Sequence, residues 1–153
     1  MQDLLRRSVM GALVGFAAAP LGSVLAAEPA VVPAKRMALQ GYDPVSYFTN
    51  GRPEKGSPEF TAAFDDATYW FKSAEHRAMF AADPERYAPQ FGGFCAISLT
   101  RGEVVEPDPE SWVIADGKLF MFGKKVGPAL FAERRASNIE KAAESWREVR
   151  KHP

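Results

Sequence analysis

The chain has 153 residues, of which 46% are hydrophobic and 25% are charged, as in a globular protein with a single domain of ordinary size. Its 19 basic and 19 acidic residues leave no net charge, so charge gives no support for a nucleic-acid or anionic-membrane partner. The single cysteine cannot form an internal disulfide, and the fold must therefore depend on packing alone.

The first 26 residues have the pattern of a signal peptide. Arg6 and Arg7 precede a charge-free run over residues 8–27 that is rich in Ala, Gly and Val. This order is typical of an export signal, and we expect cleavage after Ala26. The paired arginines favour twin-arginine translocation, with Sec export as the alternative. We therefore expect a periplasmic or otherwise exported, soluble protein; a retained membrane anchor is the alternative, which Gly and Pro in the run disfavour.

The next residues divide into a linker and a domain. Residues 27–36 contain two prolines and show no periodicity, which predicts an extended linker. We expect the folded domain over residues 37–150. Its first element is a short strand candidate at residues 45–48, which Asn50 and Gly51 end.

Two β-hairpins are expected within the domain. Residues 60–64 and 68–71 favour strands and are joined by a turn of Asp-Asp-Ala. Residues 112–115 and 118–122 flank an Asp-Gly pair, which is the strongest hairpin signal in the chain.

Helices are expected between and after these hairpins. Ser73 is an N-cap candidate for a helix over residues 74–82, and Asp83-Pro84 ends this helix and starts another turn. A C-terminal amphipathic helix that docks on the sheet is indicated by apolar residues at helical spacing: Ile139, Ala142, Ala143, Trp146 and Val149. The expected fold is therefore α+β, with a small antiparallel sheet of hairpins, short helices and a C-terminal amphipathic helix.

Cys95 is the first candidate for chemistry. A thiolate is a nucleophile and a soft metal ligand, whereas free cysteines are also among the most buried residue types. An exported protein with one unpaired cysteine in an oxidising compartment needs that thiol either buried or used. Gly92 and Gly93, just before it, permit a close backbone approach that suits a site or a tight turn. The sequence leaves both interpretations open.

His76 is the second candidate, in the first turn of the expected helix over residues 74–82. The helix dipole disfavours the imidazolium form there, so a neutral ring is available as a ligand. His76 also shares a helix face with Met79 and Phe80. The alternative interpretation is therefore a partly buried histidine packed beside the core.

Recognised catalytic spacings are absent from the sequence. It contains no Cys-x-x-Cys, no His-x-x-x-His, no Gly-x-Ser-x-Gly and no phosphate-binding glycine loop. A thiol-dependent enzyme would need a base or a second cysteine near Cys95, and the sequence offers little support for either. We therefore expect a protein that is not an enzyme.

Four segments, taken together and in order, resemble a YHS-domain protein of the small exported bacterial type. The resemblance covers about residues 38–146. It is carried by residues 41–48 (Gly-Tyr-Asp-Pro-Val-Ser-Tyr-Phe), Tyr69-x-Phe71-x-Ser73, Phe80-x-x-Asp83-Pro84-x-x-Tyr87 and residues 92–96 (Gly-Gly-Phe-Cys-Ala).

This resemblance also bears on metal binding. Ser46, Lys72 and His76 stand where metal-binding members of the wider group carry cysteines. Only His76 among these three is a good ligand for a soft or borderline metal, which excludes a closed four-ligand zinc site. A site of two or three ligands from His76, Cys95 and a third group such as Met37 would suit Cu(I) better than zinc.

The resulting hypothesis is an exported, non-enzymatic YHS-like protein that binds or hands over a metal ion. Copper is the favoured ion, and Cys95 and His76 are the expected ligands. The alternative is a metal-free structural or interaction module with a buried cysteine. The sequence identifies no protein partner. The separation between the Cys95 sulfur and the His76 ring distinguishes the two hypotheses.

Overall fold

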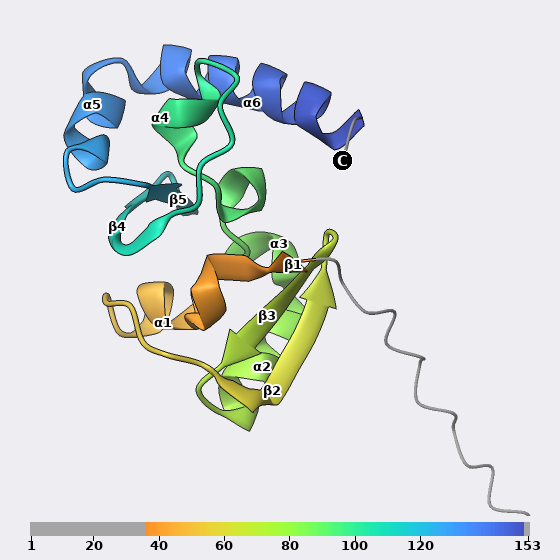
Figure 1. Ribbon diagram of the computed structural model, residues 1–153. Coiled ribbons are helices and arrows are strands. Elements are labelled where there is room, and N and C mark those ends of the chain that lie inside the picture. The colour runs from red at the N-terminus through yellow and green to blue at the C-terminus, as the bar shows by residue number, and fades with distance from the viewer. Residues whose placement is uncertain (1–35, 152–153) are drawn as a thin grey trace, which may run out of the picture. The chain divides into compact units, whose positions relative to one another are not determined.

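The computed structural model describes residues 36–151, which belong to one compact unit (Figure 1). The expected signal peptide (1–26), and the expected linker (27–36) except for Arg36, lie outside the described residues. The described part is α+β, with two small sheets and six α-helices, the last of which is the C-terminal helix, so the expected fold class is confirmed. Among residues 36–151, no helix has the length and apolar character needed to cross a membrane.

The first sheet has three strands in the order β1-β3-β2. β2 (Ser57–Phe64) and β3 (Ala67–Phe71) form the expected antiparallel hairpin, which is therefore confirmed. β1 (Arg36–Met37) runs parallel to β3 along its other edge. The sequence does not predict β1, because two residues are too few to show an alternating pattern.

The second sheet is a hairpin of β4 (Asp108–Ala115) and β5 (Lys118–Phe122). The turn residues Asp116 and Gly117 have φ values of 52° and 73°, which is the left-handed geometry that a two-residue hairpin turn requires. This hairpin prediction is confirmed. After Lys118, every residue of β5 is buried, so this strand forms the centre of its part of the core.

The expected strand at residues 45–48 is wrong, because this segment is helical. Helix α1 (Pro44–Thr49) begins directly after Asp43, whose carboxylate accepts a hydrogen bond from the backbone N–H of Val45 at 2.8 Å. Pro44 occupies the first helical position, where its fixed φ and missing N–H are favourable. The N-cap and the proline therefore outweigh the β-propensity of Val-Ser-Tyr-Phe.

The next two helices match the prediction. α2 (Ala74–Ala82) is capped by Ser73, whose hydroxyl accepts from the backbone N–H of His76 at 3.1 Å. α3 (Pro84–Tyr87) is capped by Asp83, whose carboxylate accepts from the backbone N–H of Arg86 at 3.2 Å. Short 3-10 turns, η1 (Ala38–Gly41) and η2 (Gln90–Gly93), precede α1 and follow α3.

The last part of the chain adds α4 (Ala96–Leu99), α5 (Gly127–Glu133) and α6 (Arg135–Lys151). The expected C-terminal helix is therefore present as α6. It packs mainly against α4, with further contacts to α5 and η2 (Figure 1). The expectation that this helix docks on the sheet is therefore corrected, because the elements that it contacts most are α4, α5 and η2, none of which is a strand.

Two apolar clusters form the core. In the first cluster, the Phe80 ring of α2 lies 4.9 Å from that of Tyr69 and 5.1 Å from that of Phe71, centre to centre. β5 lies between the two clusters, since Leu119 and Met121 belong to the first and Phe120 and Phe122 to the second. In the second cluster the ring of Phe120 lies 4.8 Å from that of Phe131 on α5. This division of the core matters for function because the two expected ligands fall on different sides of it.

Candidate functional site

His76 is held by a buried carboxylate. Only 7% of His76 is exposed, and its Nδ1 lies 2.7 Å from Oδ2 of Asp43, which is fully buried. The same carboxylate accepts hydrogen bonds from the backbone N–H groups of Val45, at 2.8 Å, and Lys72, at 2.9 Å. Since Asp43 acts as an acceptor for these groups, Nδ1 of His76 carries the proton and donates it. The Asp43 carboxylate thus joins α1, the end of β3 and α2.

Cys95 is used as a helix cap. Its Sγ accepts a hydrogen bond from the backbone N–H of Ser98 at 3.4 Å, at the start of α4. Its own backbone N–H donates to the carbonyl of Val105 at 2.9 Å. Cys95 is 5% exposed and packs with apolar residues of the second cluster, namely Ala96, Ala115, Phe120, Phe122 and Phe131. These contacts are those of a small buried residue.

The structure does not bring the two expected ligands into one site. The contacts of His76 belong to the Asp43 carboxylate and α1, whereas those of Cys95 belong to α4 and the second cluster. Met37, the third candidate, is 36% exposed on β1. Over residues 36–151 there is no group of three or more His, Cys, Asp or Glu residues that could hold a metal ion. The copper site with Cys95 and His76 therefore stays a hypothesis for which the described residues provide no formed donor set.

The residues that the YHS resemblance places at cysteine positions lie near Asp43. Lys72 and His76 both donate to the Asp43 carboxylate, and Ser46 lies in the helix that Asp43 caps. The Lys72 ammonium also pairs with Glu54 at 2.8 Å. Hydrogen bonds from Lys72, and next from Asn50, hold the pKa of Glu54 well below its usual range. The cation of this polar cluster is therefore the Lys72 ammonium, which is paired with the Glu54 carboxylate.

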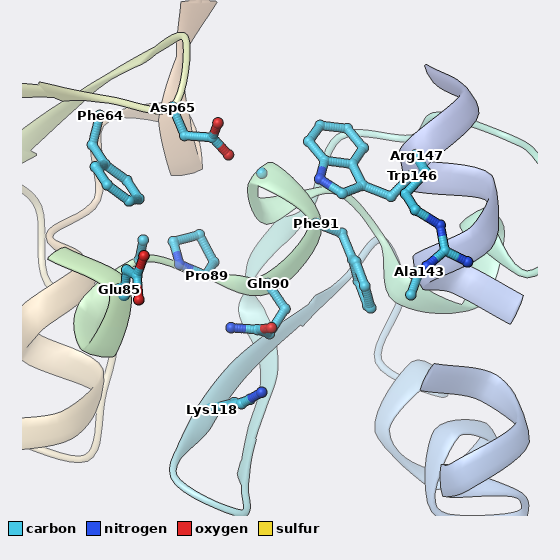
Figure 2. A pocket seen from close by; sticks show the side chains of 12 residues that line it. Phe64, Asp65, Glu85, Pro89, Gln90, Phe91, Lys118, Ala143, Trp146 and Arg147 are labelled. Carbon is cyan, nitrogen blue, oxygen red and sulfur yellow. The ribbon is translucent and has the colours of Figure 1, made fainter. Parts of the chain in front are cut away.

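A different feature, the surface around Trp146, was not identified as a site from the sequence. One hollow of about 450 Å³, which we call the Phe91 hollow, lies beside Trp146 (Figure 2). In that view Phe64, Asp65 and Glu85 lie on one side and Ala143, Trp146 and Arg147 on the other. It is lined by Phe64, Asp65, Glu85, Ala88, Pro89, Gln90, Phe91, Gly92, Lys118, Ala143, Trp146 and Arg147.

A second hollow of about 340 Å³, the Phe94 hollow, shares Asp65, Gly92 and Trp146 with the first. It is more apolar than the Phe91 hollow. It is lined by Arg36, Asp65, Asp66, Gly92, Phe94, Val104, Trp146, Val149 and Arg150. The two hollows are within the size range of about 300–1,000 Å³ that is common for ligand sites.

Gly92 makes this arrangement possible. Its φ is +61°, and a Cβ at this position would lie 2.8 Å from Cη2 of Trp146 and 3.3 Å from Nη2 of Arg36. A side chain would therefore push away both walls of the Phe94 hollow. The Gly92-Gly93 pair was the available sequence signal, since it indicates a close approach. The sequence could not show that the approaching groups come from β1 and α6.

Comparisons with known proteins identify no relative of this chain. No protein-family model matches it, and neither the curated proteins nor the solved structures give a significant match. The resemblance to YHS-domain proteins therefore stays a prediction, carried by the residues quoted for it.

Proposed function

We propose that this chain is an exported, non-enzymatic, YHS-like binding module that works without a metal ion. The observation that carries the proposal is that the side chains of His76 and Cys95 each make a structural hydrogen bond, in different parts of the fold. Nδ1 of His76 is bonded to the buried Asp43 carboxylate, and Sγ of Cys95 accepts from the backbone of α4 in a separate cluster. Export rests on the signal-peptide pattern of residues 1–26.

The surroundings of Cys95 support a role other than catalysis. A nucleophilic thiol needs access to a substrate. Cys95 is 5% exposed, and the side chains that pack around it in the second cluster are apolar. Its sulfur also takes part in capping α4. The thiol is thus placed to stabilise α4 and the second cluster.

The polar cluster around Asp43 supports a metal-free domain. Where the resemblance places metal-binding cysteines, this chain has Ser46, Lys72 and His76, and the Lys72 ammonium is paired with Glu54 at 2.8 Å. An ammonium group beside a potential metal position repels a metal cation. The concave surface available for binding lies instead at the two hollows beside Trp146.

A Cu(I) titration against a competing chelator tests this function. The protein is compared with Cys95→Ser and His76→Ala, and circular dichroism establishes that each variant is folded. We expect equal, weak binding by all three proteins, because Nε2 of His76 and Sγ of Cys95 belong to different parts of the fold and form no shared donor set. Tight binding of one Cu(I) ion that both substitutions abolish would overturn the proposal and support the copper alternative.

A further inference from the structure

The Phe91 hollow has aromatic walls that the packing of the protein holds in place. The Phe64 ring, at the end of β2, lies 6.0 Å from the Phe80 ring, centre to centre. The Phe91 ring, in η2, lies 6.0 Å from the Phe120 ring. Phe64, Phe91 and Trp146 all line the hollow, and each is partly exposed. A flat apolar group can therefore contact aromatic surfaces that are already positioned.

Charged side chains of opposite sign stand on opposite sides of this hollow. In Figure 2, Asp65 and Glu85 of α3 lie on one side, and Arg147 of α6 lies on the other. Lys118, the first residue of β5, adds a second cation to the lining. Glu85, Lys118 and Arg147 are all exposed, so a ligand can reach their charged groups. The hollow is therefore acidic on one side and basic on the other.

Three of these four charges are unpaired within the part of the chain that the structure describes. Asp65 pairs with Arg150 at 2.7 Å. Among residues 36–151, by contrast, Glu85, Lys118 and Arg147 take part in no ion pair. A ligand group of opposite sign can pair with such a charge without displacing a partner within the protein. Glu85 therefore favours a cationic group, and Arg147 and Lys118 favour an anionic one.

A ligand with a single charge matches only one side of the hollow. A carboxylate alone leaves Glu85 without a partner, and an ammonium group alone leaves Arg147 without one. A molecule that carries both groups at its two ends matches both sides. Phe64 lies on the same side as Glu85 in Figure 2, and the face of an aromatic ring also attracts a cation.

We propose that the Phe91 hollow binds a small zwitterion, with an ammonium group and a carboxylate at opposite ends of a flat apolar body. The ammonium group pairs with Glu85, and the carboxylate pairs with Arg147 in the field of Lys118. Phe91 and Trp146 contact the apolar body. The site deepens the proposed function, on which it rests, by naming the chemical class of the ligand.

Three compounds with the same ring test this specificity by NMR. The zwitterion is para-(aminomethyl)benzoate, para-toluate lacks its ammonium group, and para-methylbenzylammonium lacks its carboxylate. We expect the zwitterion to shift the indole N–H signal of Trp146, assigned with Trp146→Phe, in a saturable way. Because one exposed ion pair changes affinity by roughly two- to fivefold, each singly charged compound should bind more weakly by that factor. Absence of binding by the zwitterion, or equally tight binding of a singly charged compound, would overturn the proposal.

Two substitutions assign the two ends of the ligand. Glu85→Gln should weaken the zwitterion by roughly two- to fivefold and should not weaken para-toluate. Arg147→Gln should weaken the zwitterion by a similar factor and should not weaken para-methylbenzylammonium. Glu140→Gln and Lys141→Gln, at exposed positions of α6 outside both hollows, are the matched controls and should leave zwitterion binding unchanged. Equal binding of the zwitterion by Glu85→Gln and Glu140→Gln would contradict the site.

The outcome for this site is distinguishable from the outcome for the proposed function. The Cu(I) titration reports on Cys95 and His76, neither of which lines the Phe91 hollow. The compound series reports on Glu85, Arg147 and Trp146. A protein that binds neither copper nor the zwitterion would keep the metal-free function and lose this site.

Discussion

Nδ1 of His76 donates to Oδ2 of Asp43 over 2.7 Å, and this contact joins α2 to the start of α1. The two residues are 33 positions apart in the chain, and the carboxylate is fully buried. A carboxylate that accepts from Nδ1 is also the partner that orients histidine ligands in metal sites. In this chain the Asp43 carboxylate also accepts from the backbone N–H of Lys72, and it thereby links α1, α2 and the end of β3.

Replacement of Asp43 by alanine should destabilise the protein strongly. Asp43→Ala leaves Nδ1 of His76 and the N–H groups of Val45 and Lys72 without their acceptor, and removal of one partner from such a buried polar group costs about 3–5 kcal/mol. Urea unfolding measures the effect. Glu140→Ala removes an exposed carboxylate on α6 and should change stability by less than about 0.5 kcal/mol. A similar small effect for Asp43→Ala would contradict the role of this carboxylate.

The Cys95 thiol should resist alkylation in the folded protein. Because the side chain is 5% exposed and caps α4, labelling requires local or global opening, and its rate should follow the unfolding equilibrium. The same reagent on urea-unfolded protein gives the reference rate. Cys95→Ser should lower the free energy of unfolding by about 1–3 kcal/mol, because it places a hydroxyl in an apolar cluster. Native labelling as fast as the unfolded reference would show that the thiol is accessible.

Gly92 and Gly51 form a matched pair that separates backbone strain from steric contact. Both have a φ of +61°, but a Cβ at Gly51 meets nothing within 4 Å, whereas one at Gly92 meets Trp146 at 2.8 Å. Gly51→Ala should therefore cost about 1–2 kcal/mol from strain alone. Gly92→Ala should cost about 1–3 kcal/mol more because it displaces Trp146. Equal unfolding free energies for the two variants would mean that Trp146 is not packed against Gly92.

Acid should weaken the Lys72–Glu54 pair. Since the pKa of Glu54 in the folded protein lies below its ordinary value of 4.5, the unfolded state binds more protons as the pH falls past that value. The stabilisation is therefore present above pH 4.5 and is lost as the pH falls toward the lowered pKa.

Lys72→Met tests this, because the Lys72 hydrogen bond is the largest cause of the shift. Between about pH 6 and pH 3 the variant should lose less unfolding free energy than the unchanged protein. Lys141→Met, at an exposed position on α6, is the control and should lose as much as the unchanged protein. The pair has no role in acid stability if all three proteins lose the same amount.

Local signals account for the parts of the fold that the sequence predicts. The Ser73 cap and the Asp83-Pro84 step define α2 and α3, and the Asp-Gly turn defines the second hairpin. The same kind of signal explains the error at residues 45–48. Asp43 and Pro44 start a helix there, and their effect on the backbone is stronger than the β-propensity of the residues that follow.

The site depends on contacts that the sequence does not reveal. The contact between Arg36 and the Gly92 carbonyl joins residues 56 positions apart, and Trp146 comes from the last helix. The sequence identifies His76 as a candidate ligand and Asp43 as part of the segment at residues 41–48 that carries the resemblance. Their pairing depends on how α1, β3 and α2 pack together, which the sequence does not show. His76 lies on α2, whose Phe80 belongs to the first cluster, whereas Cys95 belongs to the second cluster.

The most direct test of the metal-free account is NMR of the His76 ring and the Cys95 side chain while Cu(I) is added. The account predicts that the His76 signals show Nδ1 protonated, and that one equivalent of Cu(I) shifts neither these signals nor those of Cys95. Simultaneous shifts of His76 and Cys95 that saturate at one equivalent would contradict it, because both side chains would then bind one ion.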